Sequence, residues 1–305
     1  MLWLIWLSLF LSTHSPAEQQ PFLVVLGTAQ DAGYPQADCR KSCCTKYWNG
    51  EQAGQHVVSL GLVDPSTDRI WMIDATPDFR DQLRTLQGFR SKTDAAPLDG
   101  IFLTHAHIGH YTGLMHLGRE VIGSKQVPVY AMPRMRSFLE ANGPWNQLVQ
   151  LQNIDLQPMQ ADSAVLLSSD FSVTPILVPH RDEYSETVGF LIRGPNRSVL
   201  FIPDIDKWEK WDRDIIEAIK KVDVAFLDGT FYQDGELPGR NMNEIPHPFI
   251  QESMELFKDL PASEKSKIHF IHFNHTNPVI FDAGAREAIE KKGYHCAFES
   301  QRILL

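Results

Sequence analysis

The chain has 305 residues, of which 43% are hydrophobic and 22% are charged, and these proportions are typical of a globular protein with a packed core. They exclude collagen-like and low-complexity chains, and no heptad pattern indicates a coiled coil. With 28 Lys and Arg against 38 Asp and Glu, the formal net charge is −10. Because a negative field repels phosphate backbones, we expect no nucleic-acid partner.

An apolar run near the N-terminus predicts a cleaved leader. Residues 2–11 are almost entirely apolar, but crossing a bilayer takes about 20 such residues. The small residues Ser15 and Ala17 follow at the spacing that signal peptidases recognise, although no basic residue precedes the run. We expect residues 1–17 to be a signal peptide and residues 18–305 to be one exported domain, periplasmic or secreted. The alternative is a buried or membrane-tethering helix, and no later stretch is apolar enough to span a membrane.

After the leader, short apolar strands alternate with helical segments. The pattern predicts strands at residues 22–26, 57–63, 70–73, 100–103, 127–131, 165–167, 171–177, 187–192, 198–202, 222–227, 267–272 and 296–298. It predicts helices at residues 76–87, 110–121, 134–141, 206–219, 248–258 and 282–291. Because no linker or repeat interrupts this alternation, it favours one α/β domain in which helices cover sheets.

Three of the four cysteines lie close together in the sequence. Cys39, Cys43 and Cys44 fall within six residues, whereas Cys296 is distant. In an exported protein an even number of cysteines suggests disulfides, although the adjacent Cys43 and Cys44 cannot readily bond to each other. A tight group of thiols also suits a structural zinc ion. The residues leave both interpretations open.

Six of the predicted strands end on residues that commonly bind metals. These residues are Asp74, His105, His180, Asp204, Asp228 and His272. Ligands gather beyond the C-terminal ends of strands in α/β proteins, because the loops there are carried by a rigid scaffold. One such residue could begin an ordinary turn, but six together predict a metal site at one sheet edge.

The densest group of these residue types is the segment Thr104-His105-Ala106-His107-Ile108-Gly109-His110. Two histidines that are two residues apart in an extended turn can direct their rings at one ion, and His110 can face a neighbouring ion. Neutral imidazole is a good ligand for zinc or iron. We expect Asp74 to support this segment by accepting hydrogen bonds from the rings. His247, which lies between two prolines, could reach the same site from a loop.

The segment resembles the His-x-His-x-Asp-His signature of the metallo-β-lactamase superfamily, and three further residues follow in that superfamily's order. The resemblance implies a four-layer αββα sandwich with metals at one edge. It implies that the first metal binds His105, His107 and His180, that Asp204 bridges, and that the second metal binds His110 and His272. Asp204 and His110 would be catalytic. Zinc is the expected metal, with iron or manganese as alternatives.

Gly109 departs from this signature, which has Asp at that position. In the superfamily that Asp binds the second metal and orients the attacking hydroxide, and glycine can do neither. A substitute such as Asp228 or His275 would have to complete the second site, and His275 is also close enough in sequence to compete with His272. We therefore expect one tightly bound metal and a second that is weak or absent. Restoring the carboxylate by Gly109→Asp is expected to raise the affinity of the second site.

A narrower resemblance covers nearly the whole chain after the leader. Residues 26–36, 73–80, 228–232 and 271–278 are similar to segments of the pyrroloquinoline-quinone biosynthesis protein B family, which favours structural zinc at the clustered cysteines. The superfamily implies a metal-dependent hydrolase that acts on a small ester, amide or phosphodiester through a metal-bound hydroxide. The alternative is an accessory protein of quinone biosynthesis, either an oxidase or a carrier.

Overall fold

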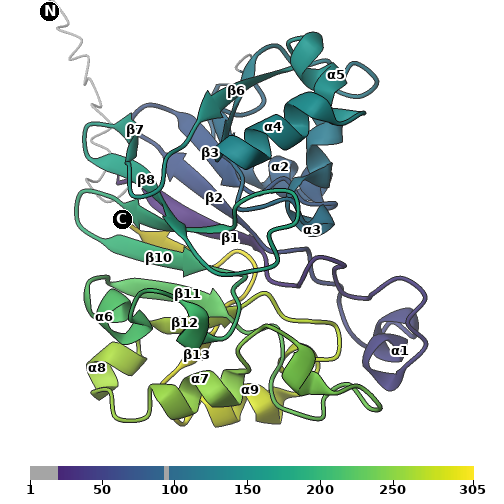
Figure 1. Cartoon of the computed structure of the whole chain (residues 1–305), viewed down its shortest axis with the longest axis vertical. Helices are drawn as coiled ribbons and strands as arrows, with labels where there is room; N and C mark the ends of the chain where they lie inside the picture. The colour runs from purple at the N-terminus through teal and green to yellow at the C-terminus, as the bar shows by residue number, and fades with distance from the viewer. Residues whose placement is uncertain (1–19, 93–95) are drawn as a thin grey trace, which may run out of the picture.

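The computed structural model describes residues 20–92 and 96–305, so the leader predicted at residues 1–17 lies outside the described residues. Two seven-stranded sheets pack face to face, and helices cover the outer face of each sheet (Figure 1). The predicted αββα sandwich is therefore confirmed. Among the described residues, no helix has both the length and the hydropathy that are needed to cross a membrane.

The first sheet has the strand order β14-β1-β2-β3-β4-β5-β6. Its strands are β1 (Phe22–Gly27), β2 (Ser59–Asp64), β3 (Arg69–Ile73), β4 (Gly100–Phe102), β5 (Val127–Ala131), β6 (Ile154–Pro158) and β14 (Arg302–Leu304). Strands β3 to β6 are parallel, and β1 runs in the same direction because it is antiparallel to β2, which is antiparallel to β3. The C-terminal ends of β1, β3 and β4 therefore meet at one edge.

The second sheet has the strand order β13-β12-β11-β10-β9-β8-β7. Its strands are β7 (Val165–Ser168), β8 (Phe171–Leu177), β9 (Val188–Arg193), β10 (Ser198–Ile202), β11 (Val224–Asp228), β12 (Ile268–Ile271) and β13 (His295–Cys296). Strands β10 to β13 are parallel, and β8 runs in the same direction because both β8 and β10 are antiparallel to β9. The residues that follow β8, β10, β11 and β12 are thus delivered to a common edge.

Helices form the two outer layers of the sandwich (Figure 1). The first sheet is covered by α2 (Phe79–Gln87), α4 (Pro133–Ala141) and α5 (Trp145–Gln150), and the second by α6 (Ile215–Lys220), α7 (Ile250–Leu256) and α9 (Ala283–Glu290). Two short helices, α3 (Ile108–Tyr111) and α8 (Ala262–Lys265), add single turns. Helix α1 (Ser42–Trp48) lies to one side of the sandwich, in the long connection between β1 and β2.

Aromatic side chains fill the space between the two sheets. Trp71 and Phe171 meet edge to face with ring centroids 5.9 Å apart, and Phe102 and Phe190 do so at 6.0 Å. These rings, together with Phe201 of β10, are completely buried. Edge-to-face contacts between buried rings add to the large apolar area that each ring removes from water. The interior therefore holds the strand ends in fixed positions.

Two predicted helices are largely wrong. Residues 206–219 form only a 3-10 turn at Trp208–Lys210 and then α6, because Asp214 caps α6 by accepting from the backbone N–H of Ile216 and begins a new helix there. Residues 110–121 form α3 and a 3-10 helix at Thr112–Leu117. The elements α1, α5, α8, β6 and β14 were not predicted, since each is short and carries little periodic signal.

We predict that Phe201→Ala lowers the free energy of unfolding by about 3–5 kcal/mol, because it leaves a cavity between the sheets. Urea denaturation followed by circular dichroism measures this change. Leu166→Ala is the matched control, since Leu166 lies on edge strand β7 and is 72% exposed, and its effect should stay within about 0.5 kcal/mol. Equal effects of the two variants would contradict the layered core described above.

Candidate metal centre

The ends of strands from both sheets bring side chains that are distant in sequence into one buried cluster built around Asp204. Three groups of ligand-type residues share this carboxylate, and within each group the ligand atoms lie within 4.8 Å of one another. The groups are His105, His107, His180 and Asp204; Asp31, His110, Asp204 and His272; and Asp204, Asp228, His247 and His272. The six strand-end residues thus do meet at one edge, as the sequence predicts.

The first group contains the three histidines that the sequence assigns to one metal. The ring centroids of His105 and His107 are 4.4 Å apart, and His180 lies 5.4 Å from the first and 4.9 Å from the second. The Nε2 atoms of His105 and His180 lie 3.4 and 3.2 Å from oxygens of Asp204. The three rings therefore converge on one point, which is the arrangement that a shared ion requires.

Three of the polar atoms at this point contact one another but form no hydrogen bond. Among the described residues, Nε2 of His105, Nε2 of His180 and Oδ1 of Asp204 are buried and have no hydrogen-bond partner. Leaving such atoms unsatisfied is costly, and a bound cation would satisfy all three. Burial also lowers the pKa of His107, which favours the neutral imidazole that binds zinc. This donor set fits a divalent metal ion.

Two threonines set the orientation of two ligand rings in the same way. The Thr104 hydroxyl donates to Asp74 at 2.9 Å and lies 3.0 Å from Nδ1 of His105. The Thr230 hydroxyl donates to Asp228 at 2.7 Å and lies 2.7 Å from Nδ1 of His272. Each hydroxyl can accept only from a protonated Nδ1, so Nε2 of each ring is left to face the centre.

Asp31 supplies the carboxylate that Gly109 lacks. Its Oδ1 lies 3.1 Å from Nε2 of His110 and 3.3 Å from Nε2 of His272. A Cβ atom at Gly109 would stand 2.3 Å from Cα of Asp31, so the missing side chain is what lets this residue approach. The expectation that Gly109→Asp would improve the second site is therefore wrong, because no space remains for the new carboxylate.

Asp31 is not among the residues predicted from the sequence, although its position after a strand is one signal. It follows β1 by four residues, and β1 runs in the same direction as β3 and β4. Of the two substitutes that the sequence suggests, Asp228 belongs to the third ligand group, which shares Asp204 and His272 with this site, and His275 lies outside all three groups. Asp228 contacts His247 and Thr230, and His275 lies beside the cysteines.

His110 lies between two carboxylates. Its Nδ1 donates to Asp74 at 2.7 Å, and its Nε2 faces Asp31. Burial opposes the charged ring, but Asp74 and Asp31 outweigh it and hold the pKa of His110 well above its ordinary value. A metal ion at Nε2 of His110 would therefore compete with a proton for this ring. The contact of Asp74 with the histidine segment is the one that the sequence predicts.

His247 reaches the centre from the loop before α7, as the sequence had suggested it could. Its Nδ1 lies 2.8 Å from Oδ2 of Asp228 and 3.3 Å from Oδ1 of Asp204. The ring is 3% exposed. Asp228 and Asp204 outweigh the opposing effect of burial and raise the pKa of His247. Asp228 thus orients His247 rather than completing the site beside Gly109.

The backbone is unusual at two of these positions. Asp74 and His272 directly follow β3 and β12, and they have φ values of 64° and 69°. Residues with side chains rarely adopt this left-handed conformation, and it is concentrated at functional sites. Here it turns the chain sharply at the strand end, at the position from which each side chain enters the cluster.

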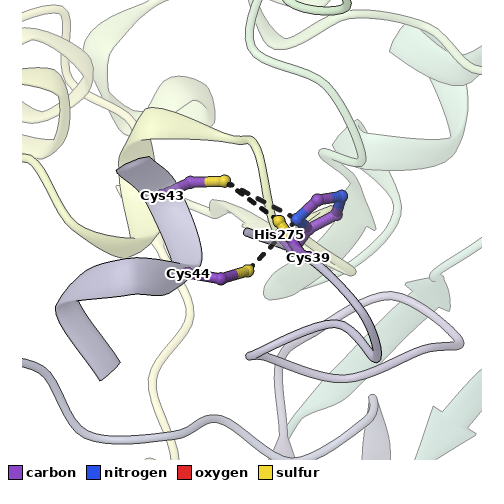
Figure 2. Close-up of side chains that lie close together, drawn as sticks. All are labelled: Cys39, Cys43, Cys44 and His275. Carbon is purple, nitrogen blue, oxygen red and sulfur yellow. Dashed lines mark hydrogen bonds between the residues drawn. The ribbon is translucent and has the colours of Figure 1, made fainter. Parts of the chain in front are cut away.

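A second cluster joins helix α1 to the loop after β12 (Figure 2). It contains Cys39, Cys43, Cys44 and His275. Sγ of Cys44 lies 3.4 Å from Nδ1 of His275, Sγ of Cys43 lies 3.7 Å from the same nitrogen, and Cys39 and Cys43 are 3.8 Å apart at sulfur. All the cysteines are free thiols, and Cys296 lies outside the cluster. The three thiols are thus close together, as predicted, and they are joined by His275, which the sequence suggested only as a possible substitute at the Asp204 centre.

Three thiols and one imidazole form a donor set that suits tetrahedral structural zinc. Burial and the charge of Lys41 lower the pKa of His275, which favours the neutral ligand. Burial raises the pKa of the Cys44 thiol to about 12, so this sulfur would lose its proton only beside a strong positive charge. A zinc ion supplies that charge.

Comparisons with known proteins agree with this geometry. A family model described as the beta-lactamase superfamily domain matches residues 69–270. The coenzyme PQQ synthesis protein B of Methylobacterium sp. (strain 4-46) is 24% identical over 92% of this chain and 99% of its own length. The protein of the same name from Xanthomonas euvesicatoria pv. vesicatoria (strain 85-10) is 26% identical over 85% of this chain and 91% of its own.

Solved structures show the same fold. The Zn²⁺-bound PqqB of Methylobacterium extorquens has a TM-score of 0.78 at 23% identity, covering 93% of this chain and 100% of that one. A diphosphatase of the PhnP family has a TM-score of 0.64 at 20% identity, covering 94% and 97%. Because the family model spans more than half of the sequence and the ligand residues occupy the sheet edge described above, the chain belongs to the beta-lactamase superfamily.

Proposed function

We propose that this chain is a metal-dependent hydrolase that acts on a small ester, amide or phosphodiester. The observation that carries the proposal is the pair of ligand groups that share Asp204, each of which offers four ligand atoms within 4.8 Å of one another. Adjacent sites that share a carboxylate are typical of two-metal hydrolytic centres. Bound zinc would lower the pKa of a coordinated water to about 7 and polarise the bond to be broken.

The charges of the centre favour two ions rather than the single tight one expected from Gly109. Three carboxylates, those of Asp31, Asp204 and Asp228, belong to the ligand groups, and Asp74 and Asp206 each contact a ligand ring. Two divalent cations would offset more of this negative charge than one could. Burial alone would raise the pKa of Asp31, but hydrogen bonds with His110 and His272 hold it well below its ordinary value, so this carboxylate is available as a ligand.

We assign the proton-transfer role to His247 instead of His110. Both ring nitrogens of His110 face carboxylates, which suits a ligand and leaves no nitrogen for substrate. His247 directs Nδ1 at Asp228 and also lines a cavity beside the centre. Its Nε2 can therefore donate a proton to the leaving group of a substrate bound in that cavity.

The similarity to coenzyme PQQ synthesis protein B along nearly the whole chain supports a second candidate. In this alternative the chain is an accessory protein of quinone-cofactor synthesis, acting as an oxidase or a carrier. Iron in place of zinc, with oxygen uptake, would mark the oxidase. Binding of a quinone without turnover would mark the carrier. We also propose that the chain is exported and that residues 1–17 are removed.

To test the hydrolase proposal, elemental analysis of the purified protein is combined with a panel of chromogenic esters and phosphodiesters. We expect zinc, and we expect turnover of at least one substrate. His105→Ala should lower kcat/KM by about 10²-fold or more, because it removes a ligand from the first group. His116→Gln is the matched control, since His116 stacks on Phe79 outside all three groups. Turnover that survives His105→Ala, or iron with oxygen uptake and no hydrolysis, would contradict the proposal.

A second prediction concerns the metal stoichiometry of the centre. Asp31→Asn should remove about one metal ion per chain after dialysis, because the second group loses its charged ligand. Gly109→Ala should have a similar effect, since a new Cβ would displace Asp31. Asp170→Asn, a change at an exposed carboxylate on the β7–β8 turn, should leave the metal content unchanged. Full occupancy in Asp31→Asn, measured by plasma mass spectrometry, would rule out this role.

A third prediction concerns the cysteine cluster. Denatured protein should titrate as four free thiols without reductant, and Cys44→Ser should lose one zinc ion while the ions at the Asp204 centre remain. Cys296→Ser is the control, because Cys296 is buried away from the cluster. Fewer than four thiols before reduction would instead indicate the disulfide that export allows.

A further inference from the structure

A cavity of about 480 Å³ adjoins the metal centre on the side of helix α1. His247 forms part of its wall, and so does Gln30, which immediately precedes Asp31. The cavity therefore opens beside two residues of the ligand groups. A molecule bound there would lie next to the proposed reaction site.

Three cationic side chains line this cavity, and they come from distant parts of the sequence. Lys41 precedes α1, Arg181 follows His180, and Arg240 lies in the loop between β11 and α7. Among the described residues, no carboxylate lies within 4 Å of any of these three cations. Many other basic side chains of the chain do form such ion pairs. Positive charge thus gathers here on a protein whose net charge is −10.

A neighbouring cavity shows that this excess of positive over negative side chains is confined to the smaller cavity. That cavity, of about 780 Å³, is also lined by basic residues, but four acidic residues accompany them: Glu209, Asp214, Glu244 and Glu252. The described lining of the smaller cavity contains neither Asp nor Glu. Like charges that line one cavity repel one another, and an anion bound among them relieves the repulsion.

The remaining lining restricts what kind of anion fits. Phe231, Leu237 and Pro246 provide apolar surface, while Gln30 and Asn274 offer amide groups. Guanidinium groups bind carboxylates and phosphates through paired hydrogen bonds. A small organic molecule with one anionic group and an apolar body matches these surfaces.

We propose that Lys41, Arg181 and Arg240 hold a carboxylate or phosphate group of the substrate, while the bond to be broken faces the Asp204 centre. This assignment rests on the hydrolase proposal, which it extends by naming the substrate class. It also connects the two clusters. The carbonyl of Lys41 accepts from the backbone N–H of Cys44 and Thr45, and His275 lines the same cavity, so the cysteine cluster fixes Lys41 in the cavity wall.

Isothermal titration calorimetry of the zinc-loaded protein tests the proposal with two probes, inorganic phosphate and succinate. We expect at least one probe to bind, and the preference between them distinguishes a phosphate from a carboxylate substrate. The triple variant Lys41→Gln, Arg181→Gln, Arg240→Gln should bind the preferred probe about tenfold more weakly or worse, with unchanged metal content. If the triple variant does not fold, the three single variants are measured, and each should weaken binding.

The matched control removes the same number and kind of charges elsewhere, through Arg84→Gln, Lys125→Gln and Arg197→Gln, at exposed positions outside the cavity. Its affinity should stay within about twofold of the unmodified protein. The proposal is overturned if the cavity variants bind within about twofold of the unmodified protein, if the control weakens equally, or if neither probe binds at about 10 mM. Because the assay measures binding and not turnover, intact anion binding without hydrolysis would overturn only the hydrolase proposal.

Discussion

Asp204 is a carboxylate that is 2% exposed, and a buried charge of this kind is costly unless opposite charge surrounds it. Six histidines place a ring nitrogen within 4 Å of its oxygens. They come from loops of both sheets, so neither sheet alone could neutralise it. Burial raises the pKa of Asp204, but the charges of His180, His247 and His272 outweigh it and hold the pKa well below its ordinary value. The aromatic interior and the strand directions hold the loops in place, and the loops bring the histidines close to the negative charge of Asp204.

The second ligand group shows how one residue's role can pass to another element of the fold. Glycine at 109 removes a side chain, and the backbone at Asp31 occupies the vacated space. The second site thereby depends on the connection between β1 and β2, which also carries Cys39, Cys43 and Cys44. Ala29, at the start of that connection, bridges to Val57 at its other end and to Phe273, which follows β12 by two residues. One segment of the chain therefore carries residues of both clusters, although each cluster has its own set of ligand-type residues.

The strand-end residues could be predicted because each directly follows an apolar run that is recognisable as a strand. Parallel strands then bring such residues to one edge of the sheet. Asp31 could not be predicted in the same way. It lies in a loop, and its place at the second site can be recognised only from its contact with Gly109, which is 78 residues away in the sequence. His275 was misplaced because the chain turns between His272 and His275, where Asn274 and Asn277 are buried and bonded to the loop after β11. Spacing along the chain does not reveal such a turn.

The backbone at Asp74 and His272 has a consequence for any attempt to make this protein more robust. Non-glycine residues in the left-handed conformation each cost on the order of 1 kcal/mol, and here the cost falls on residues that hold or support the ligands. Glycine at either position would relax the backbone and remove the side chain that the centre uses. At Asp74, however, the same change would leave the backbone N–H of Thr104 and Nδ1 of His110 buried without their acceptor, and each such loss costs about 1–3 kcal/mol. Selection for thermal stability alone would therefore retain this strained residue, so the fold itself, and not only the metal centre, depends on the carboxylate at this strand end.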